Sequence, residues 1–256
     1  MKSLLPLCLV LSIGLVACQP PGPEAAAPEP VQEQVQPSDL SLEEILAKHV
    51  EALGGQEALD AVQSVQMQGA ITSPDYSGVP ITVSIRDGER YKLEIDKQGS
   101  RTVFGFNGSM AWEIAAAMGK TDPTPMDEAE LPSFRRDADI SGVLVGYEED
   151  GYQVEVVGKT DKGYKLHAAF DNGDEKDFIL DPETFLITQT LEDRLIMGET
   201  VKQRRQFDDY REVGGRLWPF KRSTEIAQAG YRQSIVWEEI TVNPELSDEI
   251  FEMPTE

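Results

Sequence analysis

The stretch ITVSIRDGERYKLEI, residues 81–95, decides the fold. Apolar and polar residues alternate on both sides of its turn, and the apolar positions are Ile81, Val83, Ile85, Tyr91, Leu93 and Ile95. Such alternation is typical of strands with one buried face. A three-residue loop at 86–88, with Gly88 in the left-handed conformation, pairs Val83 with Tyr91 and puts both apolar sets on one face. A two-residue loop would separate them, so the stretch predicts an antiparallel hairpin with the longer loop.

Two further hairpins have the same turn chemistry. A three-residue loop at 106–108 pairs Phe104 with Met110, which places Phe104, Phe106, Met110, Trp112 and Ile114 on one face. A loop at 171–173 pairs Leu166 with Phe178 and Tyr164 with Leu180. Together the three hairpins predict a long antiparallel meander.

Helices are expected at three places. In residues 41–53, Ser41 and Glu44 form a capping box before apolar residues at helical spacing. His49 lies on that apolar stripe, so we expect a histidine packed in the core or at its rim rather than a ligand. A second short amphipathic stretch follows Gly55, and residues 128–145 read as partly helical. A large antiparallel sheet with few helices is either a sheet covered by helices or a curved half-barrel with an apolar interior.

The N-terminus carries a targeting signal. Residues 1–17 hold one lysine and an apolar stretch too short to span a bilayer, which indicates a signal peptide. The tetrapeptide Leu-Val-Ala-Cys at 15–18 resembles the lipobox of bacterial lipoproteins, in which the cysteine is acylated. Cys18 is therefore the expected lipid anchor and membrane contact. Gln19 stands where aspartate would retain an enterobacterial lipoprotein at the inner membrane, so by that resemblance we expect the periplasmic face of the outer membrane.

Composition separates the rest of the chain into two parts. Residues 18–38, rich in proline, alanine and glutamate, predict a disordered tether, and residues 39–256 predict one domain. The chain has 23 Lys and Arg against 46 Asp and Glu, a net charge of -23. Such a charge repels nucleic acids and anionic lipid headgroups, so no nucleic-acid partner is expected.

Three stretches carry a resemblance to a known family. They are ILAKHVEALGGQEALDAVQSVQMQGAI at 45–71, DYREVGGRLWPFKRSTEI at 209–226 and ITVNPELSDEIFEMP at 240–254. They resemble the LolA/LolB-like superfamily of outer-membrane lipoprotein-sorting proteins. The resemblance implies a curved antiparallel half-barrel with N-terminal and central helices covering an apolar concave face. It also implies that this face binds acyl chains of lipids or lipoproteins. An envelope protein, bound through the acidic surface, is a further candidate partner.

The ligand-binding residues expected from this combination share the predicted concave face. They are Ile81, Val83, Ile85, Tyr91, Leu93, Phe104, Phe106, Met110 and Trp112. By the resemblance, an arginine latches the lid in the soluble carrier, and Arg86, Arg90 and Arg101 are candidates here. An exposed loop protrudes in the anchored receptor; residues 115–118 fit that role, and a buried crossing of the sheet edge explains them equally.

Catalysis is not expected. The domain holds two histidines, His49 and His167, and no hydrolase elbow, zinc-protease or P-loop motif. The acidic run at 171–177 lacks the ligand spacing of an EF-hand and reads as a solvated turn, so neither a metal nor another cofactor is expected. The alternative to a lipid carrier is a closed-core envelope interaction module without a lipid ligand, because a filled core and a cavity need the same apolar residues.

Overall fold

A computed structural model describes residues 34–86, 88–196 and 199–255. Residues Gln34–Glu256 form one compact unit. The predicted signal peptide, Cys18 and most of the predicted tether lie outside the described residues. The helices are α1 (Leu42–Leu53), α2 (Gln56–Asp60) and α3 (Leu131–Ala138), with short 3-10 turns η1 (Ala116–Met118), η2 (Glu128–Glu130), η3 (Ala227–Ala229) and η4 (Asp248–Ile250).

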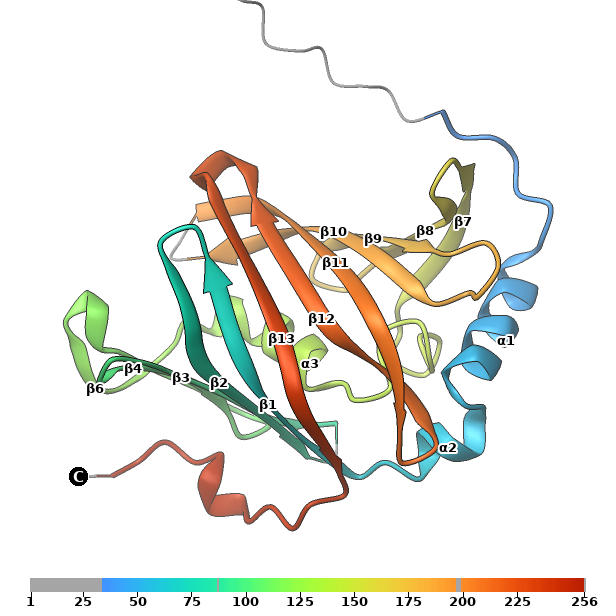
Figure 1. Ribbon diagram of the computed structural model, residues 1–256. Helices are drawn as coiled ribbons and strands as arrows, with labels where there is room; N and C mark the ends of the chain where they lie inside the picture. The colour runs from blue at the N-terminus through green and yellow to red at the C-terminus, as the bar shows by residue number, and fades with distance from the viewer. Residues whose placement is uncertain (1–33, 87, 197–198, 256) are drawn as a thin grey trace, which may run out of the picture. The chain divides into compact units, whose positions relative to one another are not determined.

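The unit is built on one antiparallel sheet of 13 strands (Figure 1). The strands are β1 (Ser64–Ser73), β2 (Tyr76–Arg86), β3 (Arg90–Lys97), β4 (Ser100–Phe106), β5 (Ala111–Ala115), β6 (Lys120–Pro125), β7 (Gln153–Thr160), β8 (Gly163–Ala169), β9 (Glu175–Leu180), β10 (Ile187–Ile196), β11 (Glu199–Val213), β12 (Arg216–Ile226) and β13 (Tyr231–Val242). Strands β1 to β6 follow one another across one half, β7 to β13 across the other, and β1 pairs with β13. The sheet curls around α3, so the predicted meander and half-barrel are confirmed.

Two of the three predicted hairpins keep the predicted apolar face. In the third hairpin Leu166 pairs with Phe178, as predicted. In the first, Val83 pairs with Leu93 instead of Tyr91, because the loop begins one residue later and Arg86 pairs with Arg90. That shift moves the pairing by an even number of residues, so the prediction of a shared apolar face holds although the predicted pairs were wrong.

The register of the second predicted hairpin was wrong in a way that changes faces. Phe104 pairs with Glu113, and Gly105 pairs with Trp112. The turn spans residues 107–110, and the Asn107 carboxamide oxygen accepts hydrogen bonds from the backbone N–H groups of Ser109 (3.1 Å) and Met110 (2.9 Å). This side-chain turn adds one residue to the loop, and an odd shift moves the following strand's side chains to the opposite face.

The helices follow their sequence signals. Helix α1 begins at the predicted capping box, in which Ser41 and Glu44 bond each other's backbone. His49 is buried and its Nδ1 lies 2.8 Å from the Phe185 carbonyl oxygen, which confirms the expectation of a packed histidine. Helix α3 is shorter than the stretch 128–145 suggested. It starts near Pro132, which suits a first helical turn, and it ends before Asp139.

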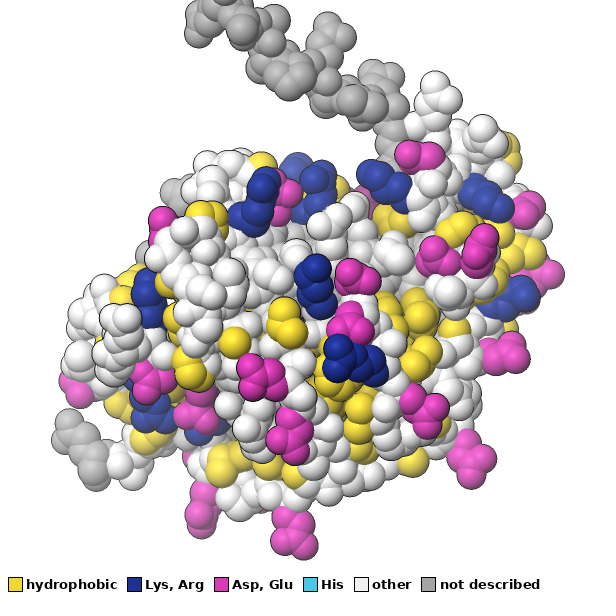
Figure 2. All heavy atoms as spheres, viewed as in Figure 1, with side chains coloured by type: hydrophobic (Ala, Val, Ile, Leu, Met, Phe, Trp, Pro, Cys, Tyr) yellow, Lys and Arg dark blue, Asp and Glu magenta, His cyan; other side chains and the backbone are white. Residues whose placement is uncertain are grey.

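Two apolar clusters lie on the concave face. Phe134 and Ala138 of α3 pack on one of them, formed mainly by β1 to β4, β12 and β13. Ile45 and Leu46 of α1 pack on the other, formed with β8 and β9, together with Val143 and Leu144 from the segment after α3. The outer face of β11 to β13 carries charged side chains interspersed with apolar ones (Figure 2). The expected covering of an apolar concave face by the N-terminal and central helices is thus observed.

Close packing of Trp112 on the opposite face requires a glycine beside it. The Trp112 indole lies over Gly105, where an added Cβ would come within 2.2 Å of the ring. Its Nε1 donates a hydrogen bond of 2.9 Å to the Phe251 carbonyl oxygen in the C-terminal segment. The indole is therefore enclosed by a strand and by that segment.

We expect Gly105→Ala to lower the free energy of unfolding by about 2 kcal/mol, because the methyl group displaces a buried ring in a packed cluster. Urea denaturation measures this loss. Ser100→Ala, at the start of the strand that contains Gly105, leaves the indole untouched and is the control. A glycine such as Gly173 is not suitable, because its φ of 84° would itself strain an alanine. An equal loss in both variants would contradict the packing argument.

The compact unit begins before the predicted domain boundary. Gln36 pairs with Lys159 at the outer edge of β7, with backbone hydrogen bonds of 2.9 and 2.8 Å. Residues 34–38, expected to belong to the tether, thus lie with the domain.

Candidate lipid-binding site on the concave face

The candidate site starts from the apolar cluster beneath α3, which we call the apolar patch. Its sheet side chains point to one face because directly paired residues of antiparallel strands share a face. They are Val65, Ile71, Val79, Ile81, Val83, Ile85, Tyr91, Phe106, Ala111, Trp218, Phe220, Ile235, Trp237 and Ile240. A surface of this kind matches the methylene groups of an acyl chain.

Most of the predicted ligand-binding residues lie on this patch. Those buried in it are Ile81, Val83, Ile85, Tyr91 and Phe106, while Leu93 and Phe104 are half-buried and pack against it. Trp112 does not belong to it. It packs with Val103 and Ile114 on the other face of the sheet, against Met253. Met110 lies in the β4–β5 turn and is not part of the patch.

Helix α3 closes the patch with one aromatic side chain. The ring of Phe134 lies 6.2 Å from that of Tyr91, 6.5 Å from that of Phe104 and 6.3 Å from that of Phe106, measured between centroids. Only 7% of Phe134 is exposed. The middle of the patch is thus occupied by a residue of the chain itself.

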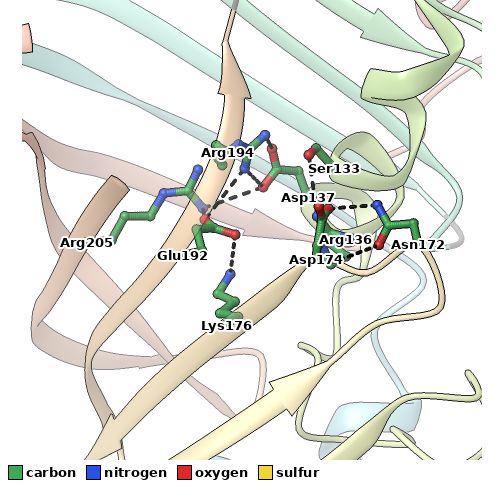
Figure 3. Close-up of polar contacts among 9 residues, drawn as sticks. All are labelled: Ser133, Arg136, Asp137, Asn172, Asp174, Lys176, Glu192, Arg194 and Arg205. Carbon is green, nitrogen blue, oxygen red and sulfur yellow. Dashed lines mark hydrogen bonds and ion pairs between the residues drawn. The ribbon is translucent and has the colours of Figure 1, made fainter. Parts of the chain in front are cut away.

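A cluster of charged residues beside the patch holds α3 in place. Both Oδ atoms of Asp137 on α3 accept hydrogen bonds from the Arg194 guanidinium, at 3.2 and 2.9 Å (Figure 3). Arg205 lies 3.6 Å from Asp137 and 3.5 Å from Glu192. Lys176 lies 3.5 Å from Glu192. We call Asp137, Lys176, Glu192, Arg194 and Arg205 the charged cluster.

Ionisation in the charged cluster is strongly coupled. Burial opposes ionisation of Asp137, but the charges of Arg194 and Arg205 outweigh it and hold the pKa of Asp137 well below its usual range. Burial likewise opposes ionisation of Glu192, and the charge of Lys176 above all lowers its pKa. Both carboxylates are therefore ionised at neutral pH.

A second contact fastens the same helix to the β8–β9 turn. Arg136 donates a hydrogen bond of 2.5 Å to Asp174, and its guanidinium lies 4.3 Å from the centre of the Phe170 ring. Asp174 belongs to the acidic run for which a solvated turn was expected. Residues 171–173 are exposed in that turn. The carboxylate of Asp174 also accepts a bond from Asn172.

The three arginines that the resemblance suggested as a lid latch pair with acidic residues outside α3. Arg86 and Arg90 lie beside Asp248 near the C-terminus, and Arg101 pairs with Glu94. The loop at 115–118 ends in an exposed 3-10 turn in which half of Met118 is accessible, so its interpretation as a buried crossing was wrong.

Sequence reasoning missed the charged cluster and Phe134. One signal was available for the cluster. In TLEDRLI, residues 190–196, and KQRRQF, residues 202–207, neither set of alternate positions is apolar throughout. Strands of a sheet with a covered face ought to have one apolar set, so polar residues in both sets indicate buried polar partners.

The described residues contain no group of three or more His, Cys, Asp and Glu side chains placed to hold a metal ion. His167 lies on the outer face, where its Nδ1 is 2.8 Å from an Asp177 oxygen. That carboxylate is also 2.8 Å from Lys165. These residues line a groove of about 380 Å³ along β7 to β11, and Lys176 and Glu192 of the charged cluster also line it.

Comparison with solved structures identifies the fold as LolA-like. The chain is similar to a LolA superfamily protein from Nitrosomonas europaea, with a TM-score of 0.54, 14% identity and coverage of 83% of this chain and 98% of that one. It is similar to a DUF1329 family protein from Desulfovibrio piger, with a TM-score of 0.55, 14% identity and coverage of 83% and 97%. It is also similar to a protein from Vibrio parahaemolyticus described as an outer membrane lipoprotein-sorting protein domain, with a TM-score of 0.52, 10% identity and coverage of 82% and 95%. No family model and no curated protein matches the sequence.

Proposed function

We propose that this chain is a lipid-anchored envelope protein that binds acyl chains of lipids or lipoproteins on the apolar patch. The acyl chain lies beneath α3, and α3 moves aside to admit it. The protein acts as a carrier or receptor and not as an enzyme. Its anchor is Cys18, and its place is the periplasmic face of the outer membrane.

The observation that carries this proposal is the way α3 covers the patch. Phe134 supplies apolar contact in the middle of the patch, and an acyl chain offers the same kind of contact to Tyr91, Phe104 and Phe106. Helix α3 takes part in no strand pairing; its polar links to the sheet include side-chain bonds to Arg194 and Asp174. Displacing it therefore leaves the sheet intact, and the ligand replaces the apolar surface that Phe134 provided.

The fold and the sequence support the location. The Vibrio parahaemolyticus protein with a similar fold is described as sorting outer-membrane lipoproteins, which favours an envelope role for this chain too. No helix among the described residues is long and apolar enough to span a bilayer. The lipobox-like tetrapeptide before Cys18 favours acylation as the means of attachment, and residues 19–33 would hold the domain away from the membrane.

Native tryptophans allow the binding face to be tested. Trp237 is buried in the apolar patch, whereas Trp112 is buried on the opposite face. Two variants of the 34–256 fragment, which holds every described element, retain one tryptophan each; the other two are changed to phenylalanine. We expect a brominated fatty acid to quench the fluorescence of Trp237 in a saturable manner and to leave Trp112 bright.

An unbrominated fatty acid of equal length is the control for each variant. Equal quenching of both tryptophans would place the ligand elsewhere or indicate nonspecific adsorption, and would contradict the proposal. No quenching in either variant after delipidation would favour the closed-core interaction module.

A further inference from the structure

Positive side chains outnumber negative ones at the boundary between the charged cluster and the apolar patch. Lys176, Arg194 and Arg205 share the carboxylates of Asp137 and Glu192. Arg222 on β12 adds a fourth cation. This excess is unusual in a chain with a net charge of -23. Unpaired charge at a covered face is costly unless a ligand compensates it.

Arg222 is the least satisfied of these cations. Its Nε is buried without a hydrogen-bond partner, and among the described residues its side chain makes no ion pair. Burial, and then the charge of Arg205, lower the pKa of Arg222 to about 10, so it is still a cation at neutral pH. Its strand partner Ile235 belongs to the apolar patch. The guanidinium therefore stands where an apolar surface meets the charged cluster.

Neighbouring polar groups are also left without partners. The Thr190 Oγ1 and Gln203 Oε1 atoms are buried and accept or donate no hydrogen bond. Thr190 pairs with Arg205 across β10 and β11, and Thr224 pairs with Arg205 across β11 and β12, so these side chains share the concave face. Arg205 itself has its nearest carboxylate oxygen at 3.5 Å, beyond good hydrogen-bond length. Several buried polar groups without partners at one place call for an explanation, and a further ligand would supply the missing hydrogen bonds.

Asp137 occupies this place as part of α3. When α3 moves aside, Arg194 and Arg205 lose its carboxylate. Glu192 then remains as the one carboxylate of the cluster, against the three cations of the cluster and the neighbouring Arg222. An incoming anion would restore the balance.

We propose that Arg205, Arg222 and Arg194 bind the anionic head group, phosphate or carboxylate, of the amphiphile whose acyl chain occupies the apolar patch. This inference rests on the proposed function. The head group takes the position of Asp137 and the chain takes that of Phe134, which lies one turn earlier on α3. The protein thereby selects anionic over neutral amphiphiles of the same chain length.

Binding of matched amphiphiles to the 34–256 fragment tests the selection. The carboxylate pair is stearic acid and stearyl alcohol; the phosphate pair is a lysophosphatidic acid and the corresponding monoacylglycerol. We expect the anionic member of at least one pair to bind about tenfold more tightly, and the pair that shows the preference identifies the head group. We expect Arg222→Gln to remove most of this preference with little effect on the neutral member, and Arg222→Lys to restore part of it.

Arg204→Gln is the matched control, because Arg204 lies on the outer face of β11 with half of its side chain exposed. It should leave every affinity unchanged. Equal affinity for the anionic and neutral members in the unmodified fragment would overturn the inference while leaving the proposed function in place. If no amphiphile binds, both fail. A preference that survives Arg222→Gln in a folded variant would exclude Arg222 from the subsite.

Discussion

Replacing Phe134 by alanine is expected to weaken the fold and strengthen ligand binding at once. Truncating a buried phenylalanine costs about 3 to 5 kcal/mol of the free energy of unfolding. The Phe134 ring packs with the rings of Tyr91, Phe104 and Phe106 only while α3 covers the patch. Removing this ring therefore favours the open state, and affinity for an acyl probe should rise by up to about a hundredfold.

Urea denaturation and titration with a fluorescent fatty acid measure the two effects on the same preparation. Phe251→Ala is the matched control, because Phe251 is fully buried but packs outside the patch, next to Trp112. It should destabilise the fold to a similar degree without raising the affinity. A fall in affinity in Phe134→Ala would contradict the view that this side chain competes with the ligand.

The second large effect is expected from Arg194→Ala. This change removes the two hydrogen bonds that Asp137 receives and one neighbour of Glu192. Removing one partner of a buried ion pair costs about 3 to 5 kcal/mol. Arg205, 3.6 Å from Asp137, remains as a partial partner, so we expect the lower end of this range, about 3 kcal/mol. The free energy of unfolding at pH 7 should fall by that amount.

The loss of stability should depend on pH in a defined direction. The pKa of Asp137 is depressed in the folded protein, so its ion pairs stabilise the fold above the unfolded pKa of about 3.9, and this contribution disappears as the pH falls through the folded pKa. In Arg194→Ala the carboxyl is protonated more readily. The difference in stability between the two proteins should therefore be largest near pH 7 and clearly smaller near pH 2.5, below the unfolded pKa.

Denaturation at both pH values checks this expectation. Arg204→Ala, on the exposed outer face of β11, should change the free energy of unfolding by less than about 0.5 kcal/mol at either pH. A deficit of equal size at pH 2.5 and pH 7 in Arg194→Ala would show that poorer packing, and not the missing charge pairing, is responsible.

The sequence predicts those parts of the fold that short-range signals determine. The capping box at Ser41 gives the start of α1, and the alternation around Gly88 and Gly173 gives hairpins whose apolar faces agree. The turn at Asn107 was misjudged because its side chain completes a longer loop. One extra residue there moved Trp112 from the expected binding face to the opposite one.

The candidate site was only half predictable for a different reason. The apolar patch comes from residues close in sequence on β2 to β4, where period two is clear. The charged cluster brings together Asp137 from a helix and residues of three other strands, among them Lys176 and Arg205. Its members contact one another across neighbouring strands or across the concave face. No pattern within a single segment of the sequence therefore predicts which charges form ion pairs.

The connection between the two halves of the sheet limits how the patch can be uncovered. Strands β6 and β7 are the two opposite edges of the sheet, and residues 126–152, with α3 among them, run from one edge to the other. The helix is thus part of a strap fixed at both ends, able to swing outward but unable to leave. Every strand hydrogen bond survives that swing, so uncovering the patch is a local event whose energy depends on a few side chains rather than on the cooperative stability of the sheet.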